Sequence, residues 1–240
     1  MKAKEILKQS GHRPFEFPEN SWKFYQEWNK TIFLHWEVNP DLVKPHLPKG
    51  MELDTIDGKT WVSLVAFDMN HIGIRSILKI PRVSDFHEIN LRIYVIYKGK
   101  PGVYFLSMEG SKRSSCKVLR TLSKFPYRFS KMKRTDFSYA SKNTEFDDSF
   151  HAEFELGNPL ETKNKTDNWL TERYVVFQDY SKNIAEYNVH HLEWPLQDIN
   201  LKKLEVNYPR FSDLINNKPD KIHYSHGVQV LAWNKIRHRT

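Results

Sequence analysis

The chain has 240 residues, with 37 Lys and Arg against 29 Asp and Glu, which gives a formal net charge of +8 at pH 7. Its single cysteine, Cys116, excludes an intrachain disulfide and a cysteine-based metal site, and fits a reducing compartment. No apolar run reaches the ~18 residues of a spanning helix, and the amino end is too polar for a signal peptide. We therefore expect a soluble, cytoplasmic protein without membrane attachment.

The positive charge is concentrated in one stretch. Between Ser111 and Thr135 the chain has nine Lys and Arg and no acidic residue, whereas the other 215 residues hold 28 basic and 29 acidic side chains. Local basicity of this kind indicates a site rather than a general affinity for polyanions. The eleven histidines show no helical pairing, so neither a metal site nor a cofactor is expected.

Strands dominate the predicted elements, and the helices are short. Apolar–polar alternation and β-rich composition predict strands over residues 31–38, 51–56, 59–69, 88–97, 103–109, 128–141, 144–156, 172–180, 184–191, 200–207 and 221–233. Asp57-Gly58 is the strongest hairpin turn signal, between the second and third of these strands. Helices are expected over 39–46, where Asn39 is an N-cap, near 169–171 and over 209–215.

The basic stretch begins with a further predicted helix. Cys116, Leu119 and Leu122 recur at helical spacing as its expected buried stripe, and Pro126 ends it. Together the elements predict one mostly β (α+β) domain over residues 1–240. Its expected architecture is an antiparallel, barrel-like structure with helices at its ends. Residues 1–20 are a candidate loosely packed segment. Long edge strands make a homodimer a candidate assembly.

The strand over residues 88–97 carries the most informative pattern. One face is polar and the other apolar; the polar face holds Glu88, Asn90, Arg92 and Tyr94. By its residues alone this face is expected to meet water, as one face of an antiparallel sheet often does.

Several runs resemble the acetoacetate decarboxylase-like superfamily. Residues 33–36, 39–42, 47–48 and 51–54 resemble the first strand, helix and second strand of that superfamily. Residues 86–88 and 120–128 are also similar to it. Three runs are similar to its YqjF-like branch, a family of unknown function: 100–105, 169–174 and 190–196. The resemblance implies a cone-shaped antiparallel β-barrel whose lumen is the ligand site, with Glu88 and Arg120 at active-site positions.

The chain departs from the decarboxylases at the reactive position. Tyr127 stands where the resemblance implies the Schiff-base lysine, and Arg128 where it implies the neighbouring lysine. A tyrosine has no amine to condense with a ketone. Lys131 is a poor substitute, because four residues along a strand it would lie about 13 Å away. If the protein is an enzyme, we do not expect Schiff-base decarboxylation.

The leading hypothesis is a polar-lined barrel that binds a small carboxylate, which arginine recognises in a bidentate manner. Its candidate catalytic residues are Glu88, Arg120 and Tyr127, and its candidate ligand-binding residues are His35, Asn90, Arg92, Tyr94 and Arg128. An enzyme using Glu88 as base and Tyr127 as acid on a carbonyl compound is about equally favoured. Weak nucleic-acid binding by residues 111–135 and peripheral membrane attachment are minor alternatives, and no sequence-specific nucleic-acid partner is expected.

Overall fold

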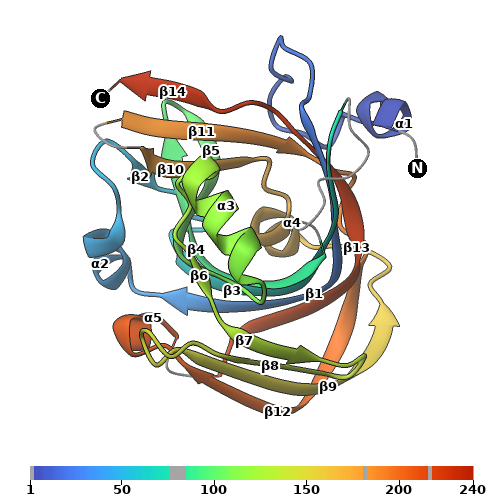
Figure 1. The fold of residues 1–240 in the computed structure, drawn as a ribbon, viewed down its shortest axis with the longest axis vertical. Helices are drawn as coiled ribbons and strands as arrows, with labels where there is room; N and C mark the ends of the chain where they lie inside the picture. The colour runs from blue at the N-terminus through green and yellow to red at the C-terminus, as the bar shows by residue number, and fades with distance from the viewer. Residues whose placement is uncertain (1–2, 76–84, 181–182, 216–217, 240) are drawn as a thin grey trace.

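The computed structural model describes residues 3–75, 85–180, 183–215 and 218–239 (Figure 1). Its strands are β1 (Phe24–Val38), β2 (Glu52–Leu53), β3 (Thr60–Ile74), β4 (Phe86–Tyr97), β5 (Lys100–Gly110), β6 (Tyr127–Phe129), β7 (Lys131–Arg134), β8 (Ser138–Lys142), β9 (Ser149–Pro159), β10 (Val175–Tyr180), β11 (Asn183–His190), β12 (Leu196–Asn207), β13 (Lys221–Ala232) and β14 (Ile236–Arg239). The α-helices are α1 (Ala3–Lys8), α2 (Pro40–Val43), α3 (Arg113–Ser123), α4 (Lys165–Thr171) and α5 (Ser212–Ile215), and short 3-10 helices cover Lys44–His46 and Pro209–Phe211. The chain is therefore mostly β, as predicted.

A ring of strands encloses the first of two large hydrophobic cores. The hydrogen-bonded order β11-β10-β5-β4-β3-β1-β13 closes on itself because β11 also pairs with β13, at Val189↔Ala232 and His190↔Leu231. Every strand of this ring contributes to one apolar cluster, which also contains Cys116 of α3 and Leu170 of α4. In Figure 1 both helices lie within the outline of the ring. We call this core the ring interior.

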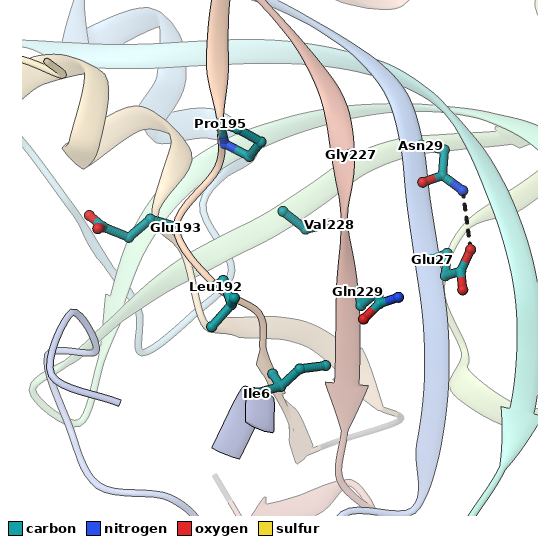
Figure 2. Close-up of a pocket in the computed structure, with 9 residues that line it drawn as sticks. All are labelled: Ile6, Glu27, Asn29, Leu192, Glu193, Pro195, Gly227, Val228 and Gln229. Atoms are coloured by element: carbon teal, nitrogen blue, oxygen red, sulfur yellow. Dashed lines mark hydrogen bonds between the residues drawn. The ribbon is translucent and has the colours of Figure 1, made fainter. Parts of the chain in front are cut away.

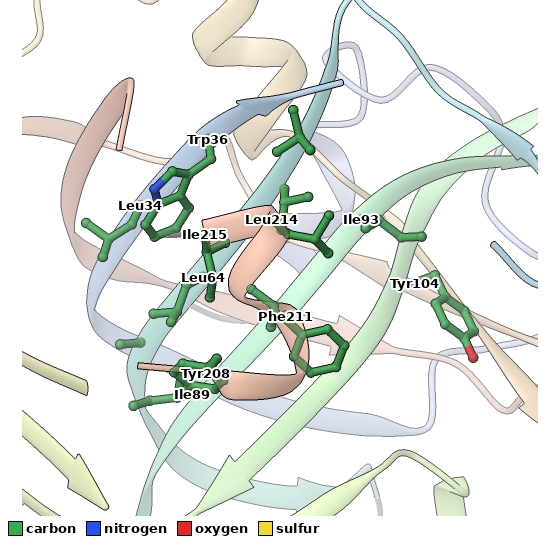
Figure 3. Packing of buried hydrophobic residues seen from close by; sticks show 14 of the residues in the cluster. Leu34, Trp36, Leu64, Ile89, Ile93, Tyr104, Tyr208, Phe211, Leu214 and Ile215 are labelled. Atoms are coloured by element: carbon green, nitrogen blue, oxygen red, sulfur yellow. The ribbon is translucent and has the colours of Figure 1, made fainter. Parts of the chain in front are cut away.

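The second core lies on the outer face of the same strands. From β13 the sheet continues through β12, β9, β8 and β7, and these strands pack with α5 against the outside of β1, β3 and β4. Figure 3 shows the segment from Tyr208 to Ile215 packed on Leu34, Leu64 and Ile93. Because successive strand residues point to opposite faces, this outer core takes Ile89, Leu91 and Ile93 of β4 and turns their neighbours inward.

The sheet is mixed rather than antiparallel. β10 pairs with β5 in parallel, and so does β6, which corrects the expected antiparallel arrangement. The strand predicted over residues 128–141 is broken into β6, β7 and β8, because the chain leaves β5 after Phe129 and turns back between Arg134 and Ser138. The Asp57-Gly58 turn forms with positive φ at both residues, but β2 pairs with β4 instead of β3.

Two helical predictions have different outcomes. Asn39 caps α2 by accepting a hydrogen bond from the Asp41 amide, as expected. Leu122 of α3 is 65% exposed, so its expected burial is wrong. The buried side of α3 is limited to Ser115 and Cys116, with Leu119 half-buried, and the last turn projects into solvent.

The amino-terminal segment packs against the ends of the ring. Ile6 of α1 is buried against Leu231 and Trp233, and Arg13 is buried as well, so this segment is not loose throughout. Across the described residues, no helix has the length and apolar character needed to cross a membrane.

Candidate functional site

Glu88 and Tyr127 form a buried pair in the ring interior. The αL residue Lys124 ends α3, and the chain then runs parallel to β5, which brings Tyr127 beside Met108. The Tyr127 hydroxyl donates to Glu88 Oε2 at 2.5 Å, and the Asn90 amide lies 3.5 Å from Glu88 Oε1. The predicted proximity of Glu88 and Tyr127 is present in the structure.

Burial shifts the pKa values of both groups. It raises the pKa of the Glu88 carboxyl to about 7, and the hydrogen bonds from Tyr127 and Asn90 offset only part of this rise. The pKa of Tyr127 lies well above 10, because of burial first and the neighbouring Glu88 carboxylate second. Glu88 can therefore gain or lose a proton near neutral pH, whereas Tyr127 keeps its hydrogen.

Arg92 is buried in the ring interior without a carboxylate partner among the described residues. Its Nη2 donates to the Leu170 carbonyl at 3.1 Å, and Nε has no hydrogen-bond partner. The guanidinium carbon lies 5.7 Å from the centre of the Tyr94 ring and 6.0 Å from that of Phe33. By contrast, buried Arg128 pairs with Asp148. Arg92 is thus a buried cation whose charge the surrounding side chains do not neutralise.

His35 and Tyr94 are joined by Ser63. His35 Nδ1 and the Ser63 hydroxyl are 2.6 Å apart, the Ser63 and Tyr94 hydroxyls are also 2.6 Å apart, and Tyr94 donates to the Leu170 carbonyl at 2.9 Å. His35, Ser63 and Arg92 are register partners across β1, β3 and β4, so they form one row on the inner face of the ring. Burial, His223 and Arg92 hold the pKa of His35 well below 6.5.

Two of the candidate residues do not join this set. Arg120 is exposed, because the last turn of α3 projects from the ring, so its expected place beside Glu88 is corrected. Arg128 donates to Ser107 and to Asp148 Oδ2 and stacks on Phe146 at 4.5 Å. It is adjacent to Tyr127 in a strand and therefore points the other way.

The structure adds groups that the sequence did not single out. Asp167 completes a capping box with Asn164, the N-cap of α4, and its Oδ1 lies 3.2 Å from His223 Nε2 and 2.7 Å from Lys221 Nζ. His223 in turn lies against His35, with ring centroids 5.4 Å apart. A lone histidine on a strand gives no sequence signal of such a pairing, because the contact depends on the β1–β13 register.

Two of the three runs similar to the YqjF-like branch, 169–174 and 190–196, contact each other. Glu172 accepts hydrogen bonds from Tyr174, Lys163 and the Trp194 amide, at 2.6, 2.7 and 2.9 Å. Arg173 pairs with Asp54. These contacts fix α4, and with it the Leu170 carbonyl that receives Arg92 and Tyr94. The runs therefore position part of the wall of the site, including Leu170 and Trp194 of the ring interior.

A surface pocket lies away from this site. Its volume is about 420 Å³ and it is lined by Ile6, Glu27, Asn29, Leu192, Glu193, Pro195, Gly227, Val228 and Gln229 (Figure 2). Glu27 already accepts hydrogen bonds from Tyr25 and Asn29. No candidate site residue lines this pocket. In the part of the chain that the structure describes, no group of three or more His, Cys, Asp or Glu could hold a metal ion.

Comparison with known proteins identifies the family. The model of the DUF2071 family, described as an uncharacterized conserved protein, matches residues 25–229. The chain belongs to this family. It is 32% identical over 227 residues to the uncharacterized protein YqjF of Bacillus subtilis (strain 168), covering 90% of this chain and 93% of that protein.

Solved structures share the fold at low sequence identity. Acetoacetate decarboxylase from Legionella pneumophila aligns with a TM-score of 0.62 and 17% identity, over 95% of this chain and 92% of that one. The enduracididine biosynthesis enzyme MppR complexed with pyruvate aligns with a TM-score of 0.62 and 11% identity, over 94% and 93% of the two chains. The chain therefore has an acetoacetate decarboxylase-like fold, as the sequence resemblance implied.

Proposed function

We propose that the ring interior is a barrel-like binding site for a small carboxylate, held by Arg92. The supporting observation is the buried guanidinium without a carboxylate partner among the described residues. Burying an unpaired cation is costly, and a ligand carboxylate would offset that cost with charge-assisted hydrogen bonds to Nε and Nη. Apolar side chains of every ring strand would surround the rest of the ligand.

The neighbouring fold agrees with this ligand class. MppR was solved with pyruvate, which is itself a small carboxylate. At 11% identity this likeness extends to the fold, so Arg92 of the present chain carries the proposal.

Calorimetric titration with carboxylates of two to six carbons tests the proposal. At least one acid should bind the wild-type chain, and Arg92→Gln should weaken that binding by about 10- to 100-fold, because a charge-assisted hydrogen bond is lost. Arg120→Gln is the matched control: it removes an exposed arginine and should leave affinity unchanged. Absence of binding by every acid, or equal loss in both variants, would contradict the proposal.

A second candidate function is acid–base catalysis next to a carbonyl. The Glu88 carboxyl, with a pKa of about 7 and a hydrogen bond from Tyr127, has the proton affinity of a general base that works at neutral pH. Glu88 would take a proton from the carbon beside the carbonyl, the electron pair would move to the carbonyl oxygen to give an enolate, and the Tyr127 hydroxyl would donate to that oxygen in place of Glu88.

Deuterium exchange tests this second function. In D₂O the protein should catalyse exchange at C2 of acetoacetate above the spontaneous rate, and Glu88→Gln should remove the catalysed part. Exchange at the spontaneous rate in the wild type, with binding intact, would leave the protein a binder without this activity.

A further inference from the structure

Polar atoms without partners in the ring interior include both donors and acceptors. Arg92 Nε and Trp61 Nε1 are donors, Asn90 Oδ1 is an acceptor, and the roles of His35 Nε2 and His223 Nδ1 depend on where the ring protons lie. All five residues are buried, with exposed fractions between 0% and 9%. The proton positions can be worked out from the hydrogen bonds.

The chain of hydrogen bonds that starts at His35 has one possible direction. The Leu170 carbonyl can only accept, so the single hydrogen of the Tyr94 hydroxyl points to it. Ser63 must then donate its own hydrogen to Tyr94, which leaves the Ser63 oxygen to accept from His35 Nδ1. The low pKa of His35 keeps the ring neutral, so its proton is on Nδ1. His35 Nε2 is therefore a bare acceptor.

His223 and Asn90 add two more acceptors. His223 Nε2 donates to Asp167 Oδ1 at 3.2 Å, and burial lowers the pKa of His223, so Nδ1 carries no proton. The Asn90 amide nitrogen faces Glu88 Oε1, which leaves Asn90 Oδ1 free. A buried acceptor without a donor costs free energy, so the ring interior favours a ligand that brings a donor.

The surroundings favour a neutral donor over a charged one. Burial first, and then His223, Arg92 and Lys221, lower the pKa of His35, so its surroundings disfavour a second positive charge. A ligand ammonium there would be repelled, whereas a hydroxyl would donate without that penalty. His35 and Arg92 lie on strands separated only by β3, so their backbones are about 10 Å apart at ~4.8 Å per strand. A ligand of a few carbons can reach both.

We propose that the ligand is a hydroxycarboxylate, with its carboxylate on Arg92 and its hydroxyl donating to His35 Nε2. This inference rests on the proposed carboxylate site and specifies the second functional group. A ketone in the same place would present another acceptor to His35 Nε2, which already lacks a donor. The site therefore binds a hydroxy acid more tightly than the matching keto acid, and His35 is a specificity-determining residue.

A matched series of four-carbon acids tests the inference by calorimetry. We expect 3-hydroxybutyrate or 4-hydroxybutyrate to bind at least about 10-fold more tightly than butyrate, acetoacetate and 4-aminobutyrate, because only the hydroxy acids supply a neutral donor. His35→Asn keeps an amide donor near the position of Nδ1 but lacks the Nε2 acceptor. It should abolish the advantage of the hydroxy acids over butyrate.

The outcomes separate the two proposals. Equal affinities for all five acids, each lost in Arg92→Gln, would overturn the hydroxyl assignment and leave the carboxylate site standing. Binding of none would overturn both. An independent readout needs neither variant nor ligand: ¹⁵N NMR of the free protein should find the His35 proton on Nδ1. A proton on Nε2 would overturn the inference.

Discussion

The clearest stability prediction concerns Glu88→Gln. A pKa of about 7 in the folded protein, against 4.5 for an ordinary glutamate, means that the folded chain binds the proton more tightly than the unfolded chain. The bound proton therefore stabilises the folded protein, and this stabilisation is complete below pH 4.5 and is lost as the pH rises through 7. At 1.36 kcal/mol per pH unit the ionised carboxylate costs up to about 3 kcal/mol at pH 8. Glu88→Gln keeps an acceptor for Tyr127 and removes that cost.

Urea unfolding at pH 5 and pH 8 measures the effect. Glu88→Gln should raise the free energy of unfolding relative to wild type at pH 8 and change it little at pH 5. Glu172→Gln is the matched control of opposite sign: burial raises the pKa of this carboxyl, but His191 and then the hydrogen bonds from Lys163 and Tyr174 outweigh burial and hold the pKa below 4.5. It should destabilise the protein at pH 8. The difference in free energy of unfolding between Glu88→Gln and wild type should be more positive at pH 8 than at pH 5. The opposite order would refute the reasoning.

Three further predictions follow from the site and its surroundings. Borohydride with acetoacetate should leave the protein mass unchanged, because position 127 has no amine and Lys131 is exposed on β7; a reduced lysine adduct would contradict this. Asp54→Asn should lower the free energy of unfolding by about 3 to 5 kcal/mol in urea titration, because it leaves the buried Arg173 guanidinium unpaired. As a control, Asp41→Asn at an exposed ion pair should change the free energy of unfolding by less than about 1 kcal/mol. Nucleic-acid binding by the basic stretch should be weak and fade between low and physiological salt, and sequence-specific binding near ~10⁻⁸ M that Lys117→Ala with Arg120→Ala abolishes would overturn the account.

The inner face of β4 is the part of the site that the sequence predicted best. Strand parity puts Glu88, Asn90, Arg92 and Tyr94 on one face, and they share one face in the structure. The preference for water that this polar face suggests is wrong, because the ring closes around it and buries it. Closure depends on the β11–β13 pairing, which joins segments far apart in the chain and has no local signal.

Arg120 and the His35 network mark the limit of prediction from sequence. The sequence locates the basic helix, but whether its last turn packs or projects depends on the path of β6, which joins β5 in parallel. The sequence also indicates His35, yet its neighbours Ser63 and His223 come from β3 and β13, and the Leu170 carbonyl that ends the network comes from α4. Side-chain networks that combine distant segments become visible only once the register of the strands is known.

The most direct test of the central claim is a crystal structure of the chain grown with 3-hydroxybutyrate. The account predicts the ligand inside the ring, with its carboxylate about 3 Å from the Arg92 guanidinium and its hydroxyl at hydrogen-bond distance from His35 Nε2. Ligand density confined to the surface pocket beside Glu27 and Gln229, or to the basic face of α3, with the ring interior empty, would contradict it.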